Sequence, residues 1–348
     1  MAFRLTSKDS VGEALKRGVQ REIERAISEL RARDRGSEAA FDARKRFKRV
    51  RAALRLVRDE LGDAVYQREN RLFRDAARSL TELRDAAVGV EALDRLIGQF
   101  AIEIKAGAFD DVRRALVATH QAVLRRVLDA DEPLAGAARM VAPARARIAD
   151  WTFERDGWPA LRSGLRRVYR AGRRARARAT AEPSVENLHE WRKQAKYLWH
   201  HLQFLEPAWI PRENDLASRV RALTRVLGED HDLAMLREAF TADPGAHGGH
   251  RVLGDLLALL ARRHATLTEQ AFALGRTLYA DAPLSFTNRI EGYWNVWTPG
   301  TGSPPKSRAR PPAAAGAASM SRPSPRPARR SAPQRTGSPR GPGRSTRS

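Results

Sequence analysis

The sequence predicts an all-α protein made of two similar helical bundles with pseudo-twofold symmetry. Apolar residues recur at three- and four-residue spacing over long windows, which is the period of an amphipathic helix. The strict alternation typical of a half-buried strand is nearly absent. The second half of the chain also repeats motifs of the first half. These three observations favour helical hairpins that occur twice.

Helical windows follow one another through residues 3–297, which we expect to form one folded body. The windows cover residues 11–33, 38–60, 66–97, 109–129, 157–179, 185–205, 212–240 and 251–280. Glycine, proline and small polar residues are typical of the breaks between helices. Such breaks are predicted at Gly36 and Ser37, at Gly62, at 131–133, at Pro183 and Ser184, at 207–211 and at 241–250.

The internal repeat aligns "FDARKRFKRVRAALRLV" from Phe41 with "HEWRKQAKYLWHHLQFL" from His189. Three pairs then fall opposite each other: Phe41 with His189, Arg44 with Arg192, and Lys48 with Lys196. Further along, Arg84 and Asp85 correspond to His231 and Asp232. The two copies are predicted to cover about 3–130 and about 150–297.

Residues 298–348 are predicted to form a disordered basic tail. From Pro299 onward there are eleven prolines and eleven lysines or arginines, but no acid. Apart from proline, Met320 is the only apolar residue there that is larger than alanine. Such a segment cannot bury enough apolar surface to offset the entropy of ordering it.

The chain has 64 lysines and arginines against 41 acids, a formal net charge of +23, and about half of this charge lies in the tail. A strong positive charge favours a polyanionic partner, such as nucleic acid, an acidic membrane surface or a phosphate polymer. There is no cysteine, which excludes disulfides, zinc–thiolate sites and thiol catalysis. The N-terminal "MAFRLTSKDS" lacks a signal-peptide core and no stretch is apolar enough to span a membrane, so we expect a cytoplasmic protein without a membrane partner.

The window 185–205 has one basic and one apolar face. Its basic stripe holds His189, Arg192, Lys193, Lys196 and His200. The opposite face, which we expect to be buried, holds Trp191, Ala195, Leu198, Leu202 and Leu205.

The window 38–60 has the same two faces. The apolar face holds Ala43, Phe47, Val50, Leu54 and Val57, and the basic face holds Arg44, Lys45, Lys48, Arg51 and Arg55. Further basic stripes consist of Arg71, Arg74 and Arg78, of Arg221 and Arg225, and of Arg162, Arg166, Tyr169, Arg170 and Arg173.

A basic face on a single helix is usually only a solvated surface. Solvated faces normally mix charges of both signs, however, because like charges four residues apart oppose a helix. These stripes are almost free of acids, which gather elsewhere, for example at Glu22, Glu24 and Glu29. Several such stripes related by a repeat favour a surface that an anion occupies.

The residues beside the stripes indicate an anion without bases. DNA-reading helices usually add Asn or Gln to their basic residues, and single-strand binders interleave exposed aromatic rings. Here Phe47, Trp191, Trp199 and Phe204 fall on or beside the apolar faces and not among the basic residues. Tyr169 and Tyr197 are the only aromatic residues of these helices that we expect to be available for stacking on bases. Arginine offers forked donors to phosphate oxygens and lysine offers point charges.

The motifs "HEWRKQAKYLWHHLQFLEP", "LGEDHDLAML" and, in the first half, "ARKRFKRVRAALRLVRDELG", "YQREN" and "LRDAAV" resemble the CHAD family, the conserved-histidine α-helical domains. The resemblance covers about residues 3–297. It implies two helical bundles around a central basic channel that binds inorganic polyphosphate, with localisation at polyphosphate granules. Neither a cofactor nor catalysis is implied.

The resemblance and the stripes together name the residues expected to bind polyphosphate. In the first repeat these are Arg44, Lys48, Arg51, Arg55, Arg74, Arg78 and Arg84. In the second repeat they are His189, Arg192, Lys193, Lys196, Arg221, Arg225 and His231, with Arg166, Arg170 and Arg173 on the helix that connects the repeats. Phe41 replaces the histidine of the family pattern in the first repeat.

Two other functions are compatible with the sequence. Nucleic acid is the alternative binding partner, chiefly through weak contacts of the basic tail. A metal-dependent phosphohydrolase would use the "HD" pair of His231 and Asp232, but the counterpart pair begins with Arg84, which is no metal ligand. We therefore expect a binding protein without a metal or cofactor.

Overall fold

The computed structural model describes residues 5, 9–32, 36–130, 132–208, 214–242 and 250–298. The chain divides into two units, residues 1–303 and residues 304–348. All regular structure in the described ranges is helical, as predicted. The predicted disordered tail, 298–348, lies outside the described residues except for Thr298.

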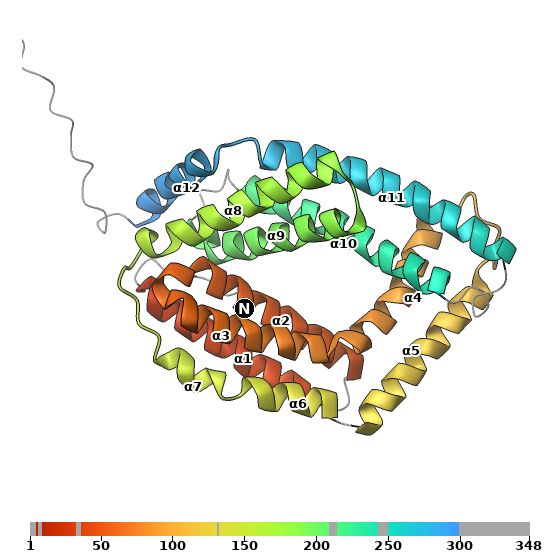
Figure 1. Ribbon diagram of the computed structural model, residues 1–348, viewed down its shortest axis with the longest axis horizontal. Coiled ribbons are helices and arrows are strands. Elements are labelled where there is room, and N and C mark those ends of the chain that lie inside the picture. The colour runs from red at the N-terminus through yellow and green to blue at the C-terminus, as the bar shows by residue number, and fades with distance from the viewer. Residues whose placement is uncertain are drawn as a thin grey trace, which may run out of the picture. The chain divides into compact units, whose positions relative to one another are not determined.

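The first half of the body contains α1 (Val11–Arg31), α2 (Gly36–Leu56), α3 (Arg58–Ser79), α4 (Thr81–Gln99), α5 (Asp110–Ala130), α6 (Glu132–Val141) and α7 (Ala144–Ala149). Helices α1, α2 and α3 pack side by side, and α6 and α7 cover α1 (Figure 1). Helix α4 continues from α3 toward α5 and α10.

The second half contains α8 (Trp158–Ala181), α9 (Val185–Phe204), the short 3₁₀ helix η2 (Glu206–Ala208), α10 (Asn214–Ala242), α11 (His250–Leu278) and α12 (Pro283–Trp297). Helix α9 packs between α8 and α10, while α11 lies on α10 and α12 on α8. Equivalent helices of the two repeats meet across the body, since α2 packs on α9 and α4 on α10. The twofold relation between the repeats stays a prediction.

The faces predicted to be buried on α2 and α9 form the core. All ten of the apolar residues predicted for these two faces are buried. Phe47 contacts Phe73 of α3, with ring centroids 5.9 Å apart, and Trp191 stacks on Phe272 of α11 at the same separation. The helical phase predicted for the two basic stripes is therefore confirmed.

Two glycines shape the packing. Gly62 has φ 73° and kinks α3, so the predicted break appears as a kink inside one helix. Gly164 brings α8 against α2 so closely that a Cβ would lie 1.8 Å from the carbonyl oxygen of Leu56.

The predicted helix boundaries need correction at several places. The window 66–97 contains two helices, α3 and α4, which meet at Leu80. Helices α6, α7 and α12 lie outside the predicted windows; Pro133 stands in a predicted break and Pro283 lies beyond the last window. Both prolines instead lie in the first turn of a helix, where the missing N–H costs nothing. By contrast, the break predicted at Pro183 and Ser184 is present, and Ser184 caps α9 by accepting a hydrogen bond from the Asn187 N–H at 3.3 Å.

No helix in the described part of the chain is long and apolar enough to cross a membrane.

Candidate anion-binding site

Helices α2, α4, α9 and α10 line a cleft of about 650 Å³. Six residues predicted to bind polyphosphate line it: Arg44, Lys48, Arg84, Arg192, Lys196 and Arg225. Its other polar and aromatic residues are Phe41, Lys45, Arg49, Glu91, Arg95, Trp199, His200, Thr224, Glu229 and Asp232. The two basic stripes thus face one another across a single cavity, because their apolar faces pack on opposite sides of it.

Lys48 of α2 is half-buried among positive charges. Burial lowers the pKa of Lys48 to about 6, and the neighbouring Arg192, Lys196, Arg44 and Arg84 lower it further. Within the described ranges, no carboxylate forms an ion pair with its amine. The amine is therefore largely uncharged at neutral pH in the free protein.

Lys196 and Arg192 of α9 share these surroundings. Burial lowers the pKa of Lys196 to about 8, with Arg192 as the next cause, while Asp232 partly offsets the effect. Burial also lowers the pKa of Arg192, whose Nε is buried without a hydrogen-bond partner. An anion in the cleft would relieve both the repulsion and the lost solvation.

Arg84 is held in place by two acids. Its guanidinium donates to Asp85 at 2.9 Å and to Asp232 of α10 at 2.8 Å. Asp232 also accepts from Arg95 at 3.1 Å. Asp232 thus holds the side chains of two arginines of α4, Arg84 and Arg95, at the cleft.

Arg44 reaches α3 and α4. Its Nη1 donates to the Ala77 carbonyl and, at 2.7 Å, to Thr81 Oγ1. Burial lowers the pKa of Arg44, an effect that Asp85 partly opposes. These neutral oxygen atoms orient the Arg44 guanidinium without neutralising its positive charge, which remains available to a bound anion.

His189 and His231 form a pair beside the cleft. Their Nδ1 atoms lie 3.4 Å apart and their ring centroids 4.5 Å apart. Burial lowers the pKa of His231 to about 3, and Arg192 adds to this shift. Burial and then Arg192 lower the pKa of His189 as well. The lowered pKa values favour the neutral form of both rings, and the 3.4 Å separation allows an Nδ1–H of one ring to donate to Nδ1 of the other.

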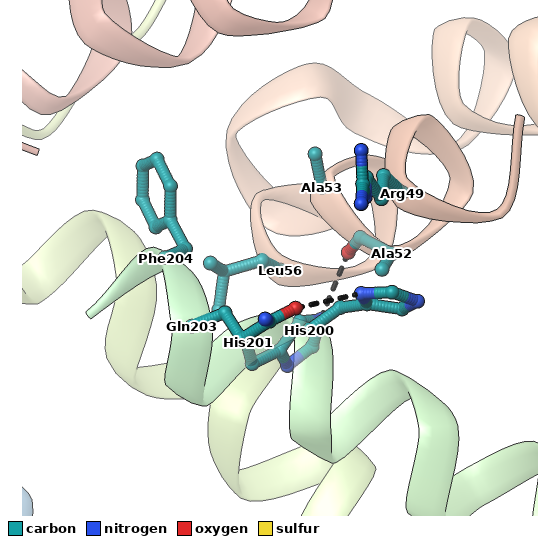
Figure 2. A pocket seen from close by; sticks show the side chains of 8 residues that line it. All are labelled: Arg49, Ala52, Ala53, Leu56, His200, His201, Gln203 and Phe204. Atoms are coloured by element: carbon teal, nitrogen blue, oxygen red, sulfur yellow. Dashed lines mark hydrogen bonds between the residues drawn. The ribbon is translucent and has the colours of Figure 1, made fainter. Parts of the chain in front are cut away.

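Two further histidines of α9 lie against α2 at a small pocket of about 40 Å³ (Figure 2). His201 Nε2 donates to the Ala52 carbonyl at 2.8 Å, and His200 Nδ1 lies 3.3 Å from Gln203 Oε1. Burial lowers the pKa of His200 to about 3 and that of His201 to about 4. His200 therefore contributes a dipole to the cleft rather than a charge.

Arg51 and Arg55, farther along α2, form a second basic group with Arg74 of α3. The side chains of Arg51 and Arg55 both donate to Asn70 Oδ1, at 3.1 and 2.8 Å. Arg55 also stacks on the ring of Tyr197 at 4.1 Å. Burial lowers the pKa of Arg51, with a smaller contribution from the charges of Arg55 and Arg74.

The remaining predicted residues lie apart from the cleft. Arg166, Arg170 and Arg173 lie on α8, where Arg162 on the same stripe contacts Asn288 of α12. Arg78 lines a neighbouring cavity beside α5 that shares Arg84 and Asp232 with the cleft, Lys193 pairs with Glu190, and Arg221 is exposed on α10. The opposite side of α8 packs on α9 and α2, a placement that the helical period alone did not reveal.

The expectations for aromatic residues need correction. Tyr169 is fully buried, stacks on Phe286 at 3.9 Å and donates to the Leu278 carbonyl, while Tyr197 is buried beneath Arg55. Trp199, expected beside the apolar face, lines the cleft. Phe41 is 43 % exposed there, with the Lys45 ammonium 3.8 Å from its ring centroid.

Sequence reasoning also missed Arg49 and Arg95. The residues of α4 that line the cleft are 84, 88, 91 and 95, which lie on one face of a helix. This spacing from Arg84 could have revealed Arg95. Arg49 lies beside the predicted stripe and pairs with Glu22 of α1 at 3.2 Å, and no sequence signal distinguishes it.

The helical residues described by the structure contain no group of three or more His, Asp or Glu side chains placed to hold a metal ion. His231 faces His189 and positive charges instead of further ligands.

The family of the chain follows from its similarity to known proteins. The model of the CHAD domain matches residues 19–241, which is more than half of the chain. The chain belongs to the CHAD family. The match begins within α1 and ends in the last turn of α10, so all the residues that line the cleft of this CHAD domain lie inside it.

The fold is also similar to the crystal structure of the CHAD domain from the plant Ricinus communis. The TM-score is 0.58 at 17 % sequence identity, and the likeness covers 79 % of this chain and 95 % of the plant domain. At this identity it concerns the fold alone. No curated protein matches the sequence.

Proposed function

We propose that this CHAD domain binds inorganic polyphosphate without catalysis, in the cleft lined by α2, α4, α9 and α10. The observation that carries the proposal is the convergence of Arg44, Lys48, Arg84, Arg192 and Lys196 on one cavity. The association of the CHAD family with polyphosphate supports it. We expect the protein to act in the cytoplasm, at polyphosphate granules.

The balance of charge in the cleft favours an anion. Each of its three acids is paired with arginine: Glu91 with Arg95, Glu229 with Arg263, and Asp232 with Arg84 and Arg95. Lys48, Arg192 and Lys196 have no such partner among the described residues. The repulsion between Arg192, Lys196 and the other arginines of the cleft, and the lost solvation of Lys48, are costs in the free protein that bound phosphates would reduce.

The length of the basic surface suits a linear polymer. Lys48, Arg51 and Arg55 occupy successive turns of α2, so basic side chains continue from the cleft to the second basic group. We infer that these regions together form the basic channel that the sequence predicts. A chain of phosphates carries charge on every unit and needs no base recognition.

Single-stranded nucleic acid is the second candidate. Phe41 and Trp199 line the same cleft, and exposed aromatic rings beside cations can stack on bases. The basic tail adds charge that attracts any polyanion.

A competition experiment separates the candidates. Labelled long-chain polyphosphate is bound to the full chain and to residues 1–298, then displaced with single-stranded DNA, RNA or unlabelled polyphosphate at near-physiological salt. We expect polyphosphate to compete best with both proteins, and tail removal to weaken nucleic-acid binding more. Equal losses for both ligands would assign binding to the tail instead of the cleft.

A further inference from the structure

Lys48 differs from an ordinary surface lysine in the groups that face it. On α2 these are Arg44, Lys45 and Arg49, and on α4 they are Arg84, Asp85, Glu91 and Arg95. On α9 they are His189, Arg192, Lys196 and His200, and on α10 they are Arg225, Glu229, His231 and Asp232. The acids in this set are paired with arginines, so positive charge dominates the surroundings of the amine.

The amine is also reachable. Lys48 lines a cleft of about 650 Å³, which is much larger than a small phosphate ester. A lysine that is desolvated beside other cations keeps its lone pair at neutral pH and acts as a nucleophile. The pKa of Lys48, lowered to about 6 by burial and by its cationic neighbours, agrees with this geometry.

We propose that Lys48 is a site of acylation by acyl phosphates, small electrophiles whose phosphate group the surrounding arginines would hold beside the amine. The proposed acylation relies on the anion affinity of the cleft proposed above. Arg44, Arg84 and Arg192 supply the donors for the phosphate, and Lys48 supplies the nucleophile.

The reaction balances without a further reactant. The Lys48 Nζ lone pair attacks the acyl carbon and forms a C–N bond. The bond between that carbon and the bridging oxygen breaks, and the phosphate leaves with the electron pair. The amine loses one proton, which the leaving phosphate takes up. The products are an amide at Lys48 and hydrogen phosphate, and neither oxidation nor reduction occurs.

Acylation would change the cleft for polyphosphate. In the free protein the amine is uncharged, but bound phosphates favour its protonated form. An amide can no longer take up that proton and fills part of the cavity. Acylation of Lys48 would thus weaken polyphosphate binding, and polyphosphate would in turn shield the amine.

The experiment uses the full chain and acetyl phosphate as the probe at pH 7.5, with site-resolved mass spectrometry as the readout. Lys45 is the matched control, since it lies on the same helix and in the same cleft but is paired with Asp42 at 3.2 Å. Exposed Lys105 is a second control. We expect Lys48 to react at least about tenfold faster than either control, because only an unprotonated amine is nucleophilic. An equal rate at Lys48 and Lys105 would overturn the proposal.

Two further arms isolate the role of the phosphate. An uncharged acetylating ester should show a smaller preference for Lys48, whereas an equal preference with both reagents would overturn the proposed phosphate contact. Lys48→Arg should remove the dominant modification and leave the rates at Lys45 and Lys105 unchanged. A redistribution of the label to Lys45 would contradict a specific site.

Long-chain polyphosphate distinguishes this inference from the proposed function. If polyphosphate binds but Lys48 reacts no faster than Lys105, the acylation site is wrong and polyphosphate binding stands. If Lys48 reacts preferentially while polyphosphate neither binds nor protects it, the reactive amine stands and the proposed function is wrong.

Discussion

Lys48 and Lys196 combine burial, positive neighbours and access to a ligand. Their lowered pKa values, about 6 and about 8, mean that the free protein holds fewer protons than its lysine content suggests. The cleft therefore limits its own charge until an anion enters. This property depends on three-dimensional neighbours from α4 and α9, so the sequence stripe alone did not predict it.

Polyphosphate binding should be linked to proton uptake. Bound phosphates raise the pKa of Lys48, so between about pH 6 and its value in the complex, binding takes up a proton. Affinity should accordingly fall as pH rises through this interval. Calorimetry at pH 7 in buffers of different ionisation enthalpy measures the uptake, and Lys48→Arg should reduce it. Binding without net proton uptake in the original protein would show that Lys48 is already charged.

Phe41 offers a second test at residue scale. Phe41→His adds a hydrogen-bond donor at the cleft rim, where Lys45 and Arg44 are neighbours. These cations should hold the new histidine's pKa below its usual value, and bound phosphate should raise it. The variant should therefore gain about 1 kcal/mol in polyphosphate affinity at pH 5.5 and less at pH 8. No greater gain at the acid pH would show that residue 41 does not contact the ligand.

At the scale of the helix, the hydrophobic periodicity was sufficient to predict the buried faces of α2 and α9. Their apolar faces are buried as predicted, and the facing stripes bring Arg44, Lys48, Arg192 and Lys196 together. Periodicity failed for α8, because it shows which face is basic but not which neighbour that face meets. The predicted windows also omitted α6, α7 and α12, and proline lies in the first turn of α6 and of α12.

Charge reversal on α9 should separate binding from stability. Arg192→Glu combined with Lys196→Glu should abolish most polyphosphate binding while the Tm stays equal or rises, because the free cleft loses repulsion. Arg46→Gln is the matched control. Arg46 lies on α2 but does not line the cleft, and it pairs with buried Glu22 and with Glu29 of α1. It should lower stability by about 1–3 kcal/mol and retain binding. Severe unfolding of the charge-reversed protein would indicate a structural role for the stripe.

The contact of α8 with α2 can be tested by adding one methyl group. Gly164→Ala would place Cβ 1.8 Å from the Leu56 carbonyl oxygen, so the helices must separate. We expect a loss of about 1–3 kcal/mol in the free energy of unfolding. Gly254→Ala on α11, where no atom lies within 4 Å, should gain up to about 1 kcal/mol. Denaturant titration compares them, and similar stabilities would contradict the close approach.

For the whole molecule, the sequence predicted the helical class and the CHAD family, and both are confirmed. The repeat predicted that α2 would have a counterpart in α9, and these helices pack together. The sequence could not show that Arg95 and Arg84 share Asp232, because residues from α4 and α10 meet only after the body has folded. The net charge of the whole chain was only a coarse guide to the charge of the folded body, since about half of it lies in the tail.

The central claim is that the cleft, rather than the tail, binds polyphosphate. The most direct test is the salt dependence of polyphosphate affinity for residues 1–298, with Arg192→Glu and Lys196→Glu as the paired comparison. Each neutralised phosphate releases counterions, so the logarithm of the affinity should fall against the logarithm of salt concentration with a slope of several units, as for DNA. The variant should show weaker binding and a shallower slope. A slope near zero, or one that the charge reversal leaves unchanged, would contradict binding in the cleft.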